Sequence, residues 1–288
     1  MSKWDGKSKG NVLGYKIFLT TLKTFGIPLT YIILRIVTFY YFLFSKKSRL
    51  PIEDFYRNAL KLPEKSITKT TRKNFFYFGQ TLIDRAAFLI GKGDVFSYTF
   101  NNEQVLVDIK NEGKGGILLS GHIGNWETAG NLLKARIMPT VNVLMLDAEE
   151  QKIKQYMSAT TGGSRFNIIP IKNDLSHVIK INNALSNNEF VAIHADRYLE
   201  GAKFIEIDFL GRKAKFPLGP FIIASKFKAS VTFVFSVKEK QYHYRLSATN
   251  PIKEKTSPEN IAQQFVKELE KKVILHPEQW FNYFDFYK

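Results

Sequence analysis

A histidine and a glutamate lie close together after an apolar segment of this chain. Residues 117 to 130 read ILLSGHIGNWETAG, in which His122 follows the end of the apolar run and Glu127 lies where a helix is expected to begin. A histidine at a strand end can take a proton from a substrate, and a carboxylate in the next helical turn can bind its other ring nitrogen and fix the tautomer. Such a pair would activate a hydroxyl group.

Neighbouring residues could support this chemistry. Asn125 is a suitable helix cap, which would place Glu127 at the positive end of the helix dipole and keep it ionised. Gly124 leaves room for a substrate to approach the backbone, and Asn125 or nearby backbone amides could stabilise an oxyanion. Asp196 follows the apolar run FVAIH, and we therefore expect it at the same sheet edge as His122.

The nucleophile is expected to come from the substrate. The chain contains no cysteine, which excludes an acyl-cysteine intermediate and cysteine-ligated zinc. Ser120 lies outside a G-x-S-x-G motif because Leu118 occupies the position of the first glycine. No histidine has H-E-x-x-H spacing, so we expect no metal and no cofactor, and His194 is interpreted as structural. These residues favour attack of a substrate hydroxyl on an acyl thioester, with His122 as general base.

The elements around these residues are expected to alternate between strands and helices. Apolar runs predict strands at 116–120, 141–146, 167–171 and 190–194, and helices are expected from about 125, from about 148 and over 174–186. Alternation of this kind predicts an α/β fold with a mixed, largely parallel sheet flanked by helices.

The flanking segments extend the same domain. We predict a helical lead-in over 51–92, a pair of strands forming a hairpin at 97–101 and 105–110, a helix over 217–227 and a last helix over 258–275.

The amino-terminal part of the chain is predicted to contact a membrane. Residues 25 to 44 read FGIPLTYIILRIVTFYYFLF, and twenty residues of helix span about 30 Å, the thickness of a bilayer's hydrocarbon core. Arg35 lies near the middle and basic residues flank both ends, which favours a tilted or interfacial anchor over a simple span. The predicted organisation is a basic segment and membrane anchor over 1–50, followed by a single α/β domain over 51–288.

The charge balance indicates an anionic partner. The chain has 42 Lys and Arg against 26 Asp and Glu, a formal net charge of +16, which favours association with nucleic acid, anionic lipids or an acidic carrier protein. A nucleic-acid-binding protein would gather these charges on one face and have no anchor. Because the charges are spread along the chain and an anchor is predicted, we expect no nucleic-acid partner.

Longer stretches of the sequence resemble a known enzyme family. The segments GHIGNWE, HADRYLEG, FLGRKAKFPLGP and HPEQWFNYF resemble the late acyltransferases of lipid A biosynthesis, within the lysophospholipid acyltransferase group, and the resemblance covers most of the chain. It implies an enzyme at the cytoplasmic face of the inner membrane. Such an enzyme moves a fatty acyl chain from acyl carrier protein or acyl-CoA to a hydroxyl group of an anionic glycolipid acceptor.

The resemblance also implies roles for individual residues. His122 and Glu127 match the catalytic pair of that family, and Asp196 matches the aspartate of its Asp-Gln turn. Arg197 replaces the glutamine of that turn, which implies a local change in substrate contacts. Arg165 is matched to a contact with an acidic headgroup or with the oxyanion.

Two alternatives stay open at this point. The same chemistry could act on another amphiphile, such as an amino-acid lipid or a polyene or pigment lipid, because no residue pattern names the acceptor. A protein that only binds an anionic surface, without catalysis, would also account for the net charge of +16.

Overall fold

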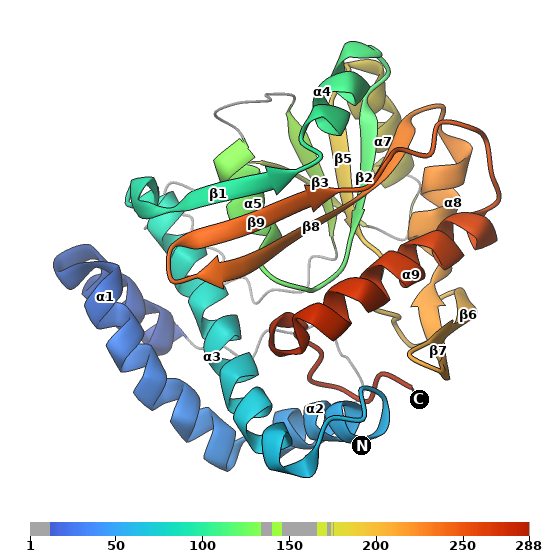
Figure 1. Cartoon of the computed structure of the whole chain (residues 1–288). Helices are drawn as coiled ribbons and strands as arrows, with labels where there is room; N and C mark the ends of the chain where they lie inside the picture. The colour runs from blue at the N-terminus through green and yellow to red at the C-terminus, as the bar shows by residue number, and fades with distance from the viewer. Residues whose placement is uncertain (1–11, 134–139, 146–165, 172–173, 175, 288) are drawn as a thin grey trace.

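The fold is built on one central sheet. A computed structural model describes residues 12–133, 140–145, 166–171, 174 and 176–287 of the chain. Its sheet has seven strands in the order β1-β9-β8-β2-β5-β3-β4 (Figure 1). The strands are β1 Ser97–Asn101, β2 Gly116–Ser120, β3 Val141–Met145, β4 Asn167–Pro170, β5 Phe190–His194, β8 Ser230–Lys240 and β9 His243–Ala248.

The strand directions confirm the predicted fold class. Strands β8, β2, β5, β3 and β4 run parallel to one another, whereas β9 is antiparallel to β8 and parallel to β1. A separate antiparallel hairpin is formed by β6 Phe204–Phe209 and β7 Arg212–Pro217. The sheet is therefore mixed and largely parallel.

Helices cover the sheet and extend beyond it (Figure 1). They are α1 Val12–Phe44, α2 Lys46–Asn58, α3 Glu64–Leu89, α4 Gln104–Asn111, α5 Trp126–Leu133, α7 Ser176–Ser186, α8 Leu218–Lys226 and α9 Pro258–Leu275, with single 3₁₀ turns at Gly93–Val95 and Pro277–Gln279. The last helix has the predicted bounds. The helix predicted from about residue 148 lies outside the described residues.

Strand β2 is buried on both faces because the sheet is covered on both sides. All of its residues are buried, and their side chains alternate between two separate cores. Ile117 and Leu119 belong to the core that contains Phe265 of α9, whereas Leu118 belongs to the core that contains Ile109 of α4. This double coverage holds the carboxyl end of β2 in a fixed position.

The predicted strand at 105–110 is wrong, because these residues form helix α4. Val105, Leu106 and Ile109 are buried on one side of that helix, and their spacing is that of a helical face. A short run rich in Val, Leu and Ile fits a strand equally well, so the sequence pattern alone is ambiguous. Strand β1 pairs in parallel with β9 instead of forming the predicted hairpin.

The apolar amino-terminal helix is longer than the predicted segment 25–44. It begins at Val12 and is kinked at Gly26, whose φ of 79° lies in the left-handed region, two residues before Pro28. It packs along α3 (Figure 1), and its buried residue Tyr31 shares a hydrophobic core with Tyr244 of β9. Its segment Gly14–Phe44 is long and apolar enough to cross a membrane, and 28% of its most apolar window is buried in the protein.

Candidate active site

His122 and Asp196 meet where two neighbouring parallel strands end. Ser120 of β2 lies opposite His194 of β5, so the residues that follow each strand share one sheet edge. Nδ1 of His122 lies 2.6 Å from Oδ1 of Asp196, and the backbone N–H of His122 donates to Oδ2 at 2.8 Å. The Asp196 side chain is fully buried, whereas that of His122 is 25% exposed. With Nδ1 held by the carboxylate, Nε2 is the nitrogen that remains for a substrate.

Glu127 forms an ion pair with Arg85. It lies in the first turn of α5, as predicted, and its Oε1 accepts a hydrogen bond from Nη1 of Arg85 at 2.9 Å. Asp196 is thus the carboxylate that contacts Nδ1 of His122, a position from which it can fix the histidine tautomer. The catalytic part of Glu127 stays a prediction. The sequence predicts Asp196 at this sheet edge but does not predict its contact with Nδ1 of His122.

Burial and the surrounding charges together favour the neutral form of His122. Burial is the largest influence and lowers the pKa of His122; the positive charge of Arg197 lowers it further, and the attraction of Asp196 only partly opposes both. Burial disfavours ionisation of Asp196, but the combined attraction of His122 and Arg197 and the hydrogen bond from His122 outweigh it, so the pKa of Asp196 lies well below its usual value. Near neutral pH the pair is an ionised carboxylate beside a neutral imidazole, the state that a general base needs.

A second histidine forms a wall of the site. The ring of His194 lies 4.4 Å from that of His122 and 5.1 Å from that of Trp126, measured between centroids. Burial, followed by the proximity of His122, lowers the pKa of His194 to about 3. His194 therefore stays neutral and packs as an aromatic surface beside the catalytic candidate.

The carboxyl-terminal tail holds the His122 turn in place. Nε1 of Trp280 donates to Oδ2 of Asp196 at 3.2 Å, and the N–H of Phe281 donates to the carbonyl oxygen of His122 at 3.0 Å. Arg197 donates from Nη2 to the carbonyl oxygen of Phe281 at 2.5 Å. Arg197 thus anchors the tail beside the site. Sequence reasoning missed the role of Trp280, since no local pattern connects it with a residue 84 positions earlier.

Asn125 is the predicted helix cap. Its Oδ1 accepts a hydrogen bond from the N–H of Thr128 at 3.2 Å. Its Nδ2 donates to the carbonyl oxygen of Thr81 and to the hydroxyl of Tyr244, each at 3.3 Å. The side-chain amide of Asn125 is therefore engaged in positioning α5, which argues against the expected role as an oxyanion donor.

Gly124 is required by the fold. Its φ is +68°, and a Cβ atom at this position would lie 1.7 Å from the carbonyl oxygen of Ser236 in β8. Its N–H donates to the carbonyl oxygen of Gln279, and the N–H of Asn125 donates to Ser236. The amides of Trp126 and Glu127, which helix geometry leaves without an intrahelical acceptor, are better candidates for oxyanion donors.

Two further expectations concern Arg165 and metal binding. Arg165 lies outside the described residues. Among the residues that the structure describes, no group of three or more His, Asp or Glu side chains is arranged to hold a metal ion.

Comparison with known families identifies the chain over most of its length. The family model of bacterial lipid A biosynthesis acyltransferases matches residues 57–285, well over half of the chain. No curated protein matches the chain. The matched region contains His122, Glu127 and Asp196 together with the tail residue Trp280, and it begins after α1.

Proposed function

The chain belongs to the bacterial lipid A biosynthesis acyltransferase family, and from this premise we propose that it transfers a fatty acyl chain to a hydroxyl group of a lipid A-like membrane lipid. Family membership makes the chain an acyltransferase, so the non-enzymatic alternative is set aside. The proposed donor is an acyl thioester, carried by acyl carrier protein or CoA. Both of these donors and a phosphorylated glycolipid acceptor are anionic, in keeping with the net charge of +16.

The proposed reaction uses His122 as general base and then as general acid. Nε2 accepts the proton of the acceptor hydroxyl as that oxygen attacks the thioester carbonyl carbon. The tetrahedral intermediate then collapses, the carbon–sulfur bond breaks, and the thiolate receives the proton from Nε2. One ester bond forms, one thioester bond breaks, and the histidine returns to its neutral state.

Asp196 and Glu127 have separate parts in this proposal. Asp196 keeps Nδ1 protonated and stabilises the imidazolium that forms when Nε2 accepts the proton. Glu127, paired with Arg85 in the first turn of α5, adds negative charge near the developing imidazolium and presents the helix amides to the oxyanion. The 2.6 Å contact between His122 and Asp196, within the region that the family model matches, is the observation that carries the proposal.

The proposed location is the cytoplasmic face of the inner membrane. The support for membrane contact comes from α1, whose segment Gly14–Phe44 is long and apolar enough to cross a membrane and still packs with one face on α3. Tyr31 on this packed face donates a hydrogen bond to the buried Asp84 of α3. A helix held in this way fits an interfacial anchor, with its outer face in the lipid, better than a free span.

Mass spectrometry of whole lipid extracts tests the function. The wild type and His122→Ala are expressed in a host that lacks its own late acyltransferases, and the extracts are searched for lipids heavier by one acyl group. A new lipid A species that appears only with the wild type supports the proposal. A new acylated lipid of another class supports the alternative acceptor. Identical extracts, with both proteins present in the membrane fraction, contradict the proposed reaction.

Glu127→Gln tests the part assigned to Glu127. This variant removes the charge and keeps the shape, so we expect a lower kcat with little change in the fold. Arg85→Gln is the matched control, since it breaks the same ion pair and leaves Glu127 charged. If both variants lose equal activity, the ion pair is what matters, and the charge of Glu127 has no separate part.

A further inference from the structure

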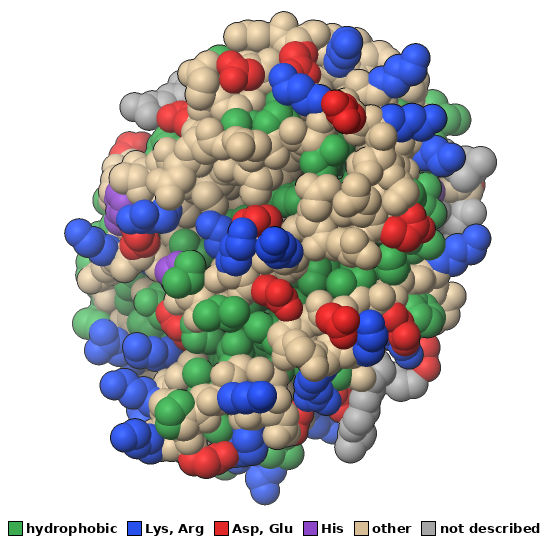
Figure 2. All heavy atoms as spheres, turned by 45° about the vertical axis from the view of Figure 1, so that its right-hand side comes forward, with side chains coloured by type: hydrophobic (Ala, Val, Ile, Leu, Met, Phe, Trp, Pro, Cys, Tyr) green, Lys and Arg blue, Asp and Glu red, His purple; other side chains and the backbone are tan. Residues whose placement is uncertain are grey.

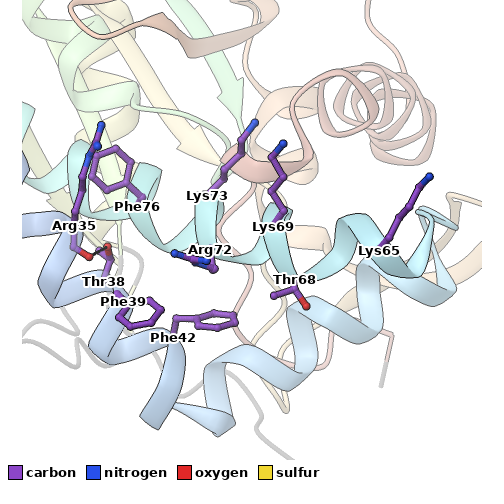
Figure 3. Close-up of a pocket in the computed structure, with 10 residues that line it drawn as sticks. All are labelled: Arg35, Thr38, Phe39, Phe42, Lys65, Thr68, Lys69, Arg72, Lys73 and Phe76. Carbon is purple, nitrogen blue, oxygen red and sulfur yellow. Dashed lines mark hydrogen bonds between the residues drawn. The ribbon is translucent and has the colours of Figure 1, made fainter.

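A groove with cationic walls lies between α1 and α3. Its volume is about 510 Å³, within the range of small-ligand sites. Arg35 of α1 and Lys65, Lys69, Arg72 and Lys73 of α3 contribute five positive charges to its lining. Figure 3 shows the three lysines projecting in a row from α3, while Arg35 projects from α1 in a similar direction beside Phe76. Neighbouring like charges in one groove repel one another, and an anion between them would relieve that repulsion.

No acidic side chain offsets these charges inside the groove. Its lining contains Phe39, Phe42, Phe76 and two threonines besides the five cations. In the described part of the chain, none of the five cations forms an ion pair with a carboxylate. Figure 2 shows a different arrangement on another face of the molecule, where Lys and Arg side chains lie among Asp and Glu side chains.

The floor of the groove is apolar and continuous with an exposed apolar helix face. Arg72 lies over the ring of Phe39, with its guanidinium carbon 5.1 Å from the ring centroid. Phe39 is itself 46% exposed, and the turns that follow it in α1 expose Tyr40, Tyr41, Leu43 and Phe44. Aromatic residues followed by Lys46 and Lys47 are typical of a segment at the level of lipid headgroups. The groove therefore opens where an anionic headgroup would lie.

We propose that this groove binds the phosphate group of an anionic membrane lipid while the exposed face of α1 lies in the bilayer. The inference deepens the proposed function, since such a lipid could be the phosphorylated acceptor itself. Charge complementarity favours phosphate, because compact ammonium groups suit it and guanidinium groups can bind two of its oxygens. The continuity with the apolar face of α1 favours a lipid over a soluble acidic protein. The groove would thus set the height and orientation of the enzyme on the membrane.

Vesicle flotation with the full-length protein tests the proposal without any requirement for catalysis. The probes are phosphatidylcholine vesicles containing phosphatidic acid, or cholesteryl hemisuccinate at matched surface charge. The groove variant carries Lys65→Gln, Lys69→Gln and Lys73→Gln. We expect it to bind phosphatidic acid vesicles roughly 100-fold more weakly than the wild type, given the contribution of each lysine near an anionic surface. The carboxylate-bearing vesicles should show a smaller difference.

A charge-matched control separates the groove from the overall charge. It carries Lys226→Gln, Lys228→Gln and Lys255→Gln, at exposed positions in or near α8 and α9. Binding close to that of the wild type supports the proposal, whereas a loss equal to that of the groove variant overturns it in favour of net charge alone. Binding of the groove variant to acyl carrier protein is also measured. If this binding is lost while vesicle flotation is unchanged, the groove binds the carrier protein and the proposed lipid site is rejected. Flotation of the groove variant equal to that of the wild type, with lipid acylation intact, would reject the groove and leave the proposed function standing.

Discussion

Two buried aspartates in this molecule form similar contacts and have opposite pKa shifts. Asp196 accepts a hydrogen bond from His122, and Asp84 accepts one from Lys238 at 2.5 Å. Burial is the largest influence on both and disfavours their ionisation. At Asp196 the attraction of neighbouring positive charge prevails and the pKa is lowered, whereas at Asp84 burial prevails and the pKa is raised.

The partners of the two aspartates differ in exposure. The side chain of His122 is 25% exposed and that of Lys238 only 4%. Asp84 also accepts hydrogen bonds from the hydroxyl groups of Tyr31 and Tyr244, so its cluster connects α1, α3, β8 and β9. The comparison shows that a buried carboxylate can prepare a base for chemistry only if its partner keeps one accessible side. When the partner is enclosed, the same kind of pair fixes the fold.

The largest expected effect comes from His122→Asn, which separates catalysis from folding at the exposed pair. The amide nitrogen of asparagine can replace Nδ1 and keep the hydrogen bond to Asp196, but no group replaces Nε2. We expect acyl transfer to fall on the order of 10²–10⁴-fold, with the free energy of unfolding changed by less than about 1 kcal/mol. Initial rates of ester formation and urea unfolding measure both. His243→Asn, outside the site, is the control. A rate within tenfold of the wild type would rule out His122 as the base.

Lys238→Met should give the opposite result at the enclosed pair. Methionine has a similar volume but leaves Asp84 buried without its cation, which costs about 3–5 kcal/mol of stability. The stability loss lowers the amount of folded protein, but the rate of acyl transfer per folded molecule should fall less, because Lys238 lies outside the catalytic contacts. Urea unfolding measures the loss. Lys240→Met, at the exposed end of the same strand, is the matched control. Equal stability of the two variants would contradict the structural role assigned to the cluster.

The sequence predicts that His122 and Asp196 lie at one sheet edge, but it does not predict the contact between Asp84 and Lys238. His122 and Asp196 each follow an apolar strand, and parallel strands bring their carboxyl ends to one edge. The sequence pattern pairs His122 with Glu127, which is near in sequence, whereas Asp196, which contacts Nδ1, is 74 residues away. Local spacing favours the nearer carboxylate, and only the register of β2 against β5 decides between the two.

The enclosed pair and the tail have no signature in the sequence. Asp84 lies in a helix and Lys238 in a strand 154 residues later, and each pattern is typical of a partly exposed element. Trp280 reaches Asp196 only because the tail after α9 returns to the sheet edge. Such contacts depend on how finished elements pack, and hydrophobic periodicity carries no information about that step.

Acid should destabilise the site region through His194. The pKa of His194 in the folded state, about 3, lies below the ordinary value. Between these two pKa values the histidine is protonated in the unfolded chain and neutral in the folded chain. Stability is therefore lost as the pH falls from about 6.5 towards 3, by up to about 1.4 kcal/mol per pH unit. His194→Phe keeps an aromatic ring and removes this titration, so its unfolding free energy should fall less between pH 6.5 and 5. Measurement at pH 7.5 isolates the packing change, and an unchanged slope would contradict the prediction.

The smallest effect is expected when both charges of the enclosed pair are removed together. In Asp84→Asn with Lys238→Met, the asparagine oxygen can still accept a tyrosine hydrogen bond, and no uncompensated charge remains buried. We expect a stability within about 1–2 kcal/mol of the wild type, well above that of Lys238→Met alone. Urea unfolding of the two single variants and the double variant gives the coupling energy.

The parallel double variant at the site makes the comparison complete. In Asp196→Asn with His122→Asn, stability should also stay near that of the wild type, but acyl transfer should stay as low as in His122→Asn. If the double variant at Asp84 and Lys238 is stable but also loses acyl transfer, the two regions are coupled. The link would then be Asn125, which caps α5 and donates to the Tyr244 hydroxyl of the enclosed cluster. A double variant at Asp84 and Lys238 that is stable yet inactive would therefore show that the cluster positions the catalytic helix.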